Sequence, residues 1–266
     1  MKISALNSDV DGTLMTHDKV LTPRTCEAVA ALHARGIGFA AISGRPPRGM
    51  RMLVEPLALT NPLGGFNGGQ ITNPDLSPLE EHALAPETAH RAYDMLRGYG
   101  LDVWVFSGQD WLLTNLDDSH VAGEIRTVHY QPLVVKDFDG ALESAFKIVG
   151  ISADHEYLAR CEAEMQAALG EAASASRSQS FYLDITHPQA NKAVGVQRLA
   201  ALMGVPMAEV AVIGDGRNDL GMFAQSGLSI AMGNAPADVR EKARFVTASN
   251  DQDGLAEAIQ RHILDA

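Results

Sequence analysis

Cysteine is almost absent from this chain, and its apolar runs are short. The 266 residues include only Cys26 and Cys161, too few for a disulfide framework or a cysteine-based zinc site, so we expect a reducing compartment. No apolar run approaches the ~18 residues that a helix needs to cross a bilayer. The run Ile3–Leu6 is too short for the apolar region of a signal peptide. These absences predict a cytoplasmic protein that has no contact with a membrane.

Positive charge is also scarce. Lysine and arginine total 21 residues against 33 aspartates and glutamates, which gives a formal net charge of −12. A phosphate backbone would be repelled on average, so we expect no nucleic-acid partner. Nothing in the sequence indicates an obligate protein partner. With 46% hydrophobic and 20% charged residues, the composition is that of a globular protein, and the length suits two domains.

Both ends of the chain alternate short apolar runs with helical patterns. We predict strands at 3–8, 38–42, 210–213, 228–231 and 244–246. Helices are expected at 23–36, 46–57, 191–203, 219–225, 236–243 and 252–264. Short apolar strands separated by helices indicate a parallel sheet covered on both faces. The predicted fold class is therefore α/β, with a Rossmann-like core.

The middle of the chain has a different pattern. A helix at 86–99 precedes two runs, 101–107 and 111–115, that predict an antiparallel hairpin. Strands at 146–151 and 180–186 flank a helix at 156–169, and the small-residue stretch 171–178 is predicted to be a solvated loop. We therefore predict a core formed by 1–82 and 189–266, and an inserted α/β domain at 83–188.

Clustered carboxylates follow two of the predicted core strands. Asp9 and Asp11 come directly after the first strand, and Gly12 then lets the backbone turn. Asp215 and Asp219 follow the strand 210–213. Because open α/β sheets bind ligands at the carboxyl ends of their strands, the four side chains can serve one site. Carboxylate oxygens are the ligands that Mg²⁺ prefers, so the sequence predicts a magnesium site there.

Each of these segments also has a simpler interpretation. An acidic turn before a glycine is often only a turn, and Asn218 or Asp219 could cap the next helix. Ser43-Gly44-Arg45 follows another predicted strand, where a hydroxyl and free backbone N–H groups suit a phosphate oxygen. A serine there could instead cap a helix. Lys192 begins a predicted helix, and taken alone it could be an ordinary surface lysine.

Taken in order, these segments resemble the four motifs of the haloacid dehalogenase superfamily. The insert resembles the large α/β cap of its Cof-type (type IIB) phosphatases, and Phe66-Asn67-Gly68-Gly69 resembles a turn of that subfamily. The stretch from Leu183 to Lys192 resembles its cap exit, and the C-terminal stretch from Asn250 to Ala258 also fits. One departure is Asn7-Ser8, which stands where a more apolar strand end is usual.

The resemblance implies a Mg²⁺-dependent phosphatase that acts on a small phosphorylated metabolite through an aspartyl phosphate. Asp9 would be the nucleophile, and Asp11 would protonate the leaving group and then activate water. The metal would be held by Asp9, the backbone carbonyl of Asp11, Asp215 and Asp219. Phosphate would be bound by side chains and backbone groups of Gly12, Thr13, Ser43, Gly44, Arg45, Lys192 and Asn218.

The expected charges of the site predict one further property. The carboxylates of the two acidic segments, together with a phosphate dianion, outnumber the positive charges of Lys192 and Mg²⁺. Since like charges raise the pKa of a carboxyl group, we expect the pKa of Asp11 to be raised, which suits a general acid.

Several alternatives stay open or are excluded by the sequence. A dinucleotide-binding loop lacks its third glycine at Asp219, and a P-loop lacks its Gly-Lys pair. A sugar phosphomutase would use the same aspartyl phosphate, so product analysis must separate it from a phosphatase. A non-catalytic phosphate-binding relative would be expected to have lost Asp9 or Asp11. Residues of the insert that could either bind substrate or form its core are Trp104, Trp111, Arg126, His129 and His187.

Overall fold

The computed structural model describes residues 2–265, which form two compact units. One unit comprises the residues up to Leu79 together with those from Asn191 onward, and the other is Glu80–Ala190. The predicted domain boundaries at 83 and 188 lie within a few residues of these divisions. None of the helices among residues 2–265 is long and apolar enough to cross a bilayer.

The first unit is built on a parallel five-stranded sheet of order β14-β13-β12-β1-β2. The strands are β1 (Ala5–Ser8), β2 (Gly38–Ala41), β12 (Val210–Gly214), β13 (Leu228–Ala231) and β14 (Phe245–Val246). Ala5 of β1 pairs with Val210 on one side and Gly38 on the other. The parallel α/β core is therefore confirmed, and the carboxyl ends of β1 and β12 are neighbours.

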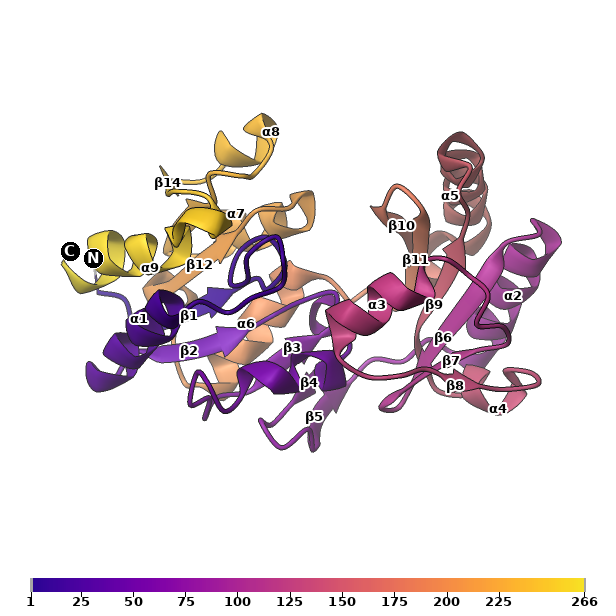
Figure 1. The fold of residues 1–266 in the computed structure, drawn as a ribbon, viewed down its shortest axis with the longest axis horizontal. Helices are drawn as coiled ribbons and strands as arrows, with labels where there is room; N and C mark the ends of the chain where they lie inside the picture. Colours follow the sequence, from indigo (N-terminus) through magenta and orange to yellow (C-terminus); the bar gives the residue numbers. More distant parts are fainter. Residues whose placement is uncertain (1, 266) are drawn as a thin grey trace. The chain divides into compact units, whose positions relative to one another are not determined.

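Helices cover both faces of this sheet (Figure 1). On one face, α1 (Pro23–Ala34) and α9 (Gly254–Ile259) pack against the apolar cluster that contains Leu6 and Phe39. On the other face, α6 (Lys192–Leu202) and α7 (Leu220–Gln225) pack against the cluster that contains Val212. Thr22 caps α1 by accepting a hydrogen bond from the Thr25 backbone N–H, ahead of proline at the first helical position.

Two predictions in this unit need correction. The segment 46–57 contains a short 3₁₀ helix, Pro47–Leu53, instead of an α-helix, and α8 (Ala237–Arg240) is shorter than expected. A small sheet was not predicted from the sequence; it is formed by β3 (Leu63–Gly65), β4 (Gln70–Thr72) and β5 (Pro78–Glu81). Each of these strands has only three or four residues, too few for a period-two pattern to be recognised.

The second unit is a six-stranded sheet of order β10-β11-β9-β6-β7-β8 with helices. Its strands are β6 (Asp102–Ser107), β7 (Asp110–Leu113), β8 (Leu133–Val134), β9 (Ala145–Ile151), β10 (Ser174–Gln179) and β11 (Tyr182–Thr186). All pairs are antiparallel except β7 with β8. The helices are α2 (Pro86–Gly98), α3 (Val121–Val128), α4 (Asp139–Leu142) and α5 (His155–Leu169).

The two faces of this second sheet have different side chains. Val103 and Val105 point to the face packed by α2, α4 and α5. The alternate residues of β6, Trp104 and Phe106, are buried on the other face, where Trp104 contacts Trp111 edge-on at a centroid distance of 4.8 Å. Trp104 and Trp111 therefore belong to the interior of the inserted unit.

The stretch 171–178 was predicted to be a solvated loop, and this is wrong. It contains most of β10, which pairs antiparallel with β11 through a register that includes Ser174 with Thr186. Most of β10 is exposed because it is an edge strand. Its serines and alanines have little β-propensity of their own, so pairing with β11 determines its conformation.

Candidate active site

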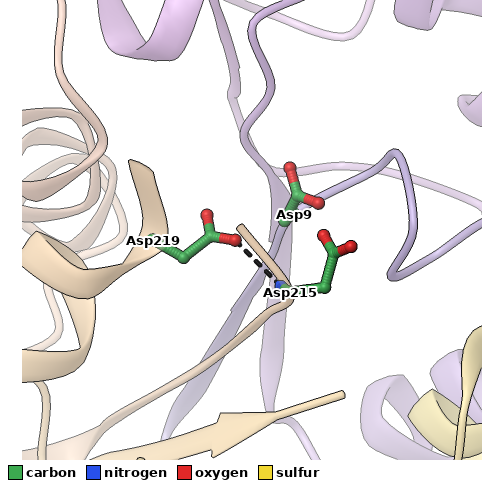
Figure 2. Close-up of side chains that lie close together, drawn as sticks. All are labelled: Asp9, Asp215 and Asp219. Carbon is green, nitrogen blue, oxygen red and sulfur yellow. Dashed lines mark hydrogen bonds between the residues drawn. The ribbon is translucent and has the colours of Figure 1, made fainter. Parts of the chain in front are cut away.

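Three aspartates converge at the carboxyl ends of β1 and β12. Asp9 follows β1 directly, and its backbone N–H donates to the carbonyl of Ile213 at 3.0 Å, which fixes it beside the end of β12. Asp215 follows β12, and Asp219 comes one turn later. One carboxylate oxygen from each residue lies within 4.8 Å of the others. Figure 2 shows the three side chains close together, presented by two separate segments.

Lys192 connects two of these carboxylates. It is the first residue of α6, whose N-terminus is capped by Asn191 through the Val194 backbone N–H. The Lys192 ammonium donates to Asp9 Oδ1 and, at 2.6 Å, to Asp219 Oδ1. The side chain is only 1% exposed. Because burying an unpaired ammonium is costly, this lysine is stable here only through its carboxylate partners.

The pKa values in this cluster reflect burial and a shortage of positive charge. Burial opposes the charged form of Lys192, but Asp219 and Asp9 outweigh it and hold its pKa above the usual range. Burial raises the pKa of Asp9 to about 8; Lys192 opposes that shift, while Asp219 and Asp215 add to it. Burial and the neighbouring Asp219 raise the pKa of Asp215 to about 6. Added positive charge would therefore stabilise the ionised cluster.

The donor set of the cluster fits a hard divalent cation. All the free acceptors are carboxylate oxygens, which suits Mg²⁺. Asp219 is largely engaged by the protein, because its Oδ2 accepts the backbone N–H of Asp215 at 2.9 Å (Figure 2) and that of Gly216 at 2.8 Å. Asp9 and Asp215 retain more free acceptor capacity, so they are better placed to contact a cation directly.

Two glycines allow this close arrangement. Gly12 has a φ of +79°, and a Cβ added there would lie 2.3 Å from Asp215 Oδ2. A Cβ at Gly214 would lie 2.3 Å from Asp219 Oδ2. Both separations are far below van der Waals contact, so any other residue would displace a carboxylate of the cluster.

Asp11 lies apart from the cluster in a different charge environment. Arg45 binds its carboxylate with two hydrogen bonds of 2.7 Å, from Nε to Oδ2 and from Nη2 to Oδ1. The Lys19 ammonium donates to Oδ1 at 2.6 Å. Burial disfavours the ionised form, but Arg45 and Lys19 outweigh it and lower the pKa of Asp11 to about 2. The predicted rise in this pKa is therefore wrong, because two cations not foreseen as its partners bind this carboxylate.

The remaining predicted phosphate-binding residues lie around the same strand ends. Thr13 Oγ1 donates to Asp215 Oδ1 at 3.4 Å. Ser43 follows β2 and is buried, and its hydroxyl accepts the backbone N–H of Arg45 at 3.2 Å. Asn218 donates to the side chain of Asn67 at 3.3 Å. A Cβ at Gly44 would lie 3.6 Å from the same Asn67 amide, so Gly44, Asn67 and Asn218 are neighbours.

Lys19 and Asn234 were not predicted as site residues, and Asn67 was predicted only as part of a turn. Lys19 lies in a loop with a φ of +60° and gives no periodic signal. Asn234 follows β13 in a Gly-Asn pair that suggests only a turn. Lys19 lies 8 residues from Asp11, and Asn234 lies 19 residues from Asp215. These contacts depend on how the loops fold, so the residue pattern does not reveal them.

Comparison with known proteins supports what the geometry indicates. A family model for haloacid dehalogenase-like hydrolases matches residues 6–259. The HMP-PP phosphatase of Cronobacter sakazakii is 31% identical over 234 residues, which cover 85% of this chain and 83% of that protein. A haloacid dehalogenase-like hydrolase from Bacteroides thetaiotaomicron superposes with a TM-score of 0.90 at 29% identity, covering 98% and 99% of the two chains.

A subclass IIB sugar phosphatase of the same superfamily has this fold as well. It superposes with a TM-score of 0.83 at 22% identity, covering 98% of each chain. The inserted α/β unit is therefore of the kind that the sequence resemblance predicted. With the family model spanning nearly all of the sequence, the chain belongs to the haloacid dehalogenase-like hydrolases and is a phosphatase.

Proposed function

We propose that this chain is a Mg²⁺-dependent phosphomonoesterase that forms an aspartyl phosphate on Asp9. The observation that carries this proposal is the convergence of Asp9 with Asp215, Asp219 and Lys192 at neighbouring strand ends. A buried carboxylate beside an ammonium and further carboxylates has the groups needed for a nucleophile, a phosphate ligand and a cation site.

The cation would be held by Asp9, Asp215 and the backbone carbonyl of Asp11, with Asp219 supporting them. When bound, Mg²⁺ neutralises charge on the carboxylates and on the transferring phosphoryl group. Lys192 would bind a phosphate oxygen while keeping its contact with Asp219. Ser43, Asn218, Arg45 and the backbone N–H groups of Gly12, Thr13 and Gly44 would bind the other phosphate oxygens.

Asp9 begins the reaction by attacking phosphorus in line with the ester oxygen. The new bond joins Asp9 to phosphorus, the ester P–O bond breaks, and the leaving oxygen takes a proton from Asp11. In the second step, Asp11 removes a proton from water as the water attacks phosphorus. The bond between phosphorus and Asp9 then breaks, and inorganic phosphate is released.

The contacts of Asp11 add a condition to this scheme. With its pKa lowered to about 2 by Arg45 and Lys19, Asp11 is ionised at neutral pH, as a base requires. It can act as an acid only after substrate binding has weakened one of these contacts. Lys19 is the contact that can move more easily, because its side chain is 33% exposed whereas that of Arg45 is 3% exposed.

The substrate is proposed to be a small phosphorylated metabolite, such as a sugar phosphate. The C. sakazakii relative is named as an HMP-PP phosphatase, and a Bacillus subtilis relative, 27% identical over 258 residues, as a 5-amino-6-(5-phospho-D-ribitylamino)uracil phosphatase. The buried position of Asp9 also favours a slender monoester over a macromolecular phosphate. We propose that 1–82 and 189–266 form the catalytic core, and that the insert 83–188 selects the leaving group, as caps do in this family.

Phosphate release from a panel of phosphorylated metabolites tests the proposal. Wild-type protein and Asp9→Asn are assayed with Mg²⁺ and with EDTA, and inorganic phosphate is measured alongside any isomerised product. We expect Mg²⁺-dependent release that falls by ~10³-fold or more in Asp9→Asn, as for the loss of other enzymatic nucleophiles. Retained activity in Asp9→Asn would rule out the covalent mechanism, and an isomerised sugar phosphate without free phosphate would identify a phosphomutase.

A further inference from the structure

Asn234, in the loop that follows β13, uses its side-chain amide for three contacts with the protein. Its Nδ2 donates to the carbonyl of Gly12 at 2.9 Å and to Asp215 Oδ2 at 3.1 Å. Its Oδ1 accepts the backbone N–H of Asn250 at 3.0 Å. The residue is exposed, and an exposed side-chain amide usually forms its hydrogen bonds with water. Here the amide is instead held by three separate segments.

The contact with Asp215 is one of those that hold this carboxylate. Asn234 binds Oδ2, and Thr13 Oγ1 donates to Oδ1 at 3.4 Å. Each oxygen of Asp215 thus has a partner from a different loop, so rotation of the carboxylate would break at least one hydrogen bond. The plane of Asp215 is fixed before any ligand arrives.

The segment that binds Asn234 also binds the loop that follows β1. Asn250, which binds Asn234 through its backbone, donates from its buried side chain to the carbonyl of Met15 at 2.9 Å. The neighbouring Asp251 accepts the backbone N–H of His17 at 2.8 Å. The C-terminal segment that begins at Asn250 therefore holds both Asn234 and the loop that carries Gly12 and Thr13.

We infer that Asn234 is a positioning residue for the cation site, because it fixes the direction of the Asp215 carboxylate. The inference rests on the proposed function, in which Asp215 is a ligand of Mg²⁺. A carboxylate that is already oriented loses less freedom when it binds a cation. Loss of a hydrogen-bond partner that orients a ligand typically costs about 10–100-fold in metal affinity.

The test measures Mg²⁺ binding to the full-length, metal-free protein by titration calorimetry, without substrate. For Asn234→Ala we expect a Kd for Mg²⁺ about 10–100-fold higher than wild type. At saturating Mg²⁺, kcat should return to near the wild-type value, because the reacting groups are unchanged. Asn73→Ala is the matched control: the Asn73 amide donates to Ser77 at 2.9 Å, and its loss should leave the Kd unchanged.

The outcomes separate this inference from the proposed function. Wild-type protein that binds no Mg²⁺ would overturn the metal assignment and the positioning role with it. Wild-type binding with a Kd that Asn234→Ala changes by less than about twofold would overturn only the positioning role. A lower kcat at saturating Mg²⁺ with an unchanged Kd would also overturn the positioning role. Asn234 would then influence the reaction through its contact with Gly12 and not through the cation site.

A second variant covers the case in which Asn234→Ala does not fold. Asn234→Asp keeps the acceptor for the Asn250 N–H but places a carboxylate against Asp215 Oδ2. We expect its metal-free Tm to fall through like-charge repulsion and Mg²⁺ to restore it. A fall in Tm that Mg²⁺ does not restore, or no fall at all, would place the amide outside the cation site and overturn the inference.

Discussion

Asp9 shows how far burial, together with neighbouring carboxylates, can shift the pKa of one residue. With the pKa of Asp9 at about 8, the metal-free protein holds this carboxyl protonated at pH 7, and a protonated carboxyl is a poor nucleophile. The raised pKa stabilises the metal-free fold at low pH, and this contribution is lost as the pH rises through about 8. A bound cation lowers the pKa of Asp9, because it favours the ionised form of the carboxyl group.

Mg²⁺ binding should therefore release a proton from Asp9. We expect about one proton at pH 7, falling toward zero above about pH 9, because metal ligands must be deprotonated. Calorimetric titration in two buffers with different ionisation enthalpies measures the number. Asp9→Asn is the control and should lose this release. The same proton count at pH 7 and pH 9 would contradict the origin of the proton in Asp9.

Lys19 and Arg45 set the charge state of Asp11. Removing the ammonium in Lys19→Met should raise the pKa of Asp11 from about 2 toward its ordinary value, because one of two cations is lost. The ¹³C chemical shift of the Asp11 carboxyl, followed against pH, measures the change. Lys2→Met removes an equally charged group that pairs with Glu209, and it should leave Asp11 unaffected. If the Asp11 titration is unchanged in Lys19→Met, Lys19 does not contribute and Arg45 alone lowers the pKa of Asp11.

At the scale of elements, helix starts place catalytic side chains as well as stabilise the fold. Asn191 caps α6 through Val194, and the next residue is Lys192. Asp154 caps α5 in the same way through Tyr157, but α5 lies in the other unit. The two caps therefore have the same structural role, but only Asn191 is adjacent to Lys192 in the sequence.

Asn191→Ala and Asp154→Ala should have different effects. Each should lower the free energy of unfolding of its own unit by about 1 kcal/mol, measured by urea denaturation followed by circular dichroism. Only Asn191→Ala should also lower kcat/KM, because fraying of the first turn of α6 displaces the Lys192 ammonium. Equal kcat/KM values for the two variants would show that the cap has no part in placing this lysine.

At the scale of the whole molecule, the two units have separate apolar clusters and can be followed separately. Both tryptophans of the chain, Trp104 and Trp111, are buried in the inserted unit. The three clustered aspartates belong to the other unit. Tryptophan fluorescence therefore reports on the insert, whereas Mg²⁺ should stabilise the unit that binds it.

We expect Mg²⁺ to raise the Tm measured by circular dichroism more than the Tm measured by tryptophan fluorescence. A ligand stabilises only the folded unit to which it binds, by an amount set by its concentration relative to Kd. Thermal scans with Mg²⁺ and with EDTA give both values, and Asp215→Ala is the control in which neither should move. Equal shifts in both signals would show that the two units unfold as one.

The sequence by itself determined the parallel α/β core, the inserted unit and the order of the acidic segments. These follow from apolar periodicity, from helix caps such as Thr22 and Asn191, and from the rule that ligands bind at strand ends. Such signals are local, so a few consecutive residues contain them. The position of Asp9 beside Asp215 could be predicted because parallel strands bring their carboxyl ends together.

Only the tertiary structure decided which charges meet. Arg45 and Lys19 reach Asp11, and Lys192 reaches Asp9 across 183 residues of sequence, so the pKa values could not be obtained from residue patterns. The contact of Asn234 with Asp215 joins two different strand-end loops, and the hairpin that makes β10 a strand depends on its pairing with β11 and not on the β-propensity of its own residues. Electrostatic interaction depends on distance and burial, and both are set by packing and not by order along the chain.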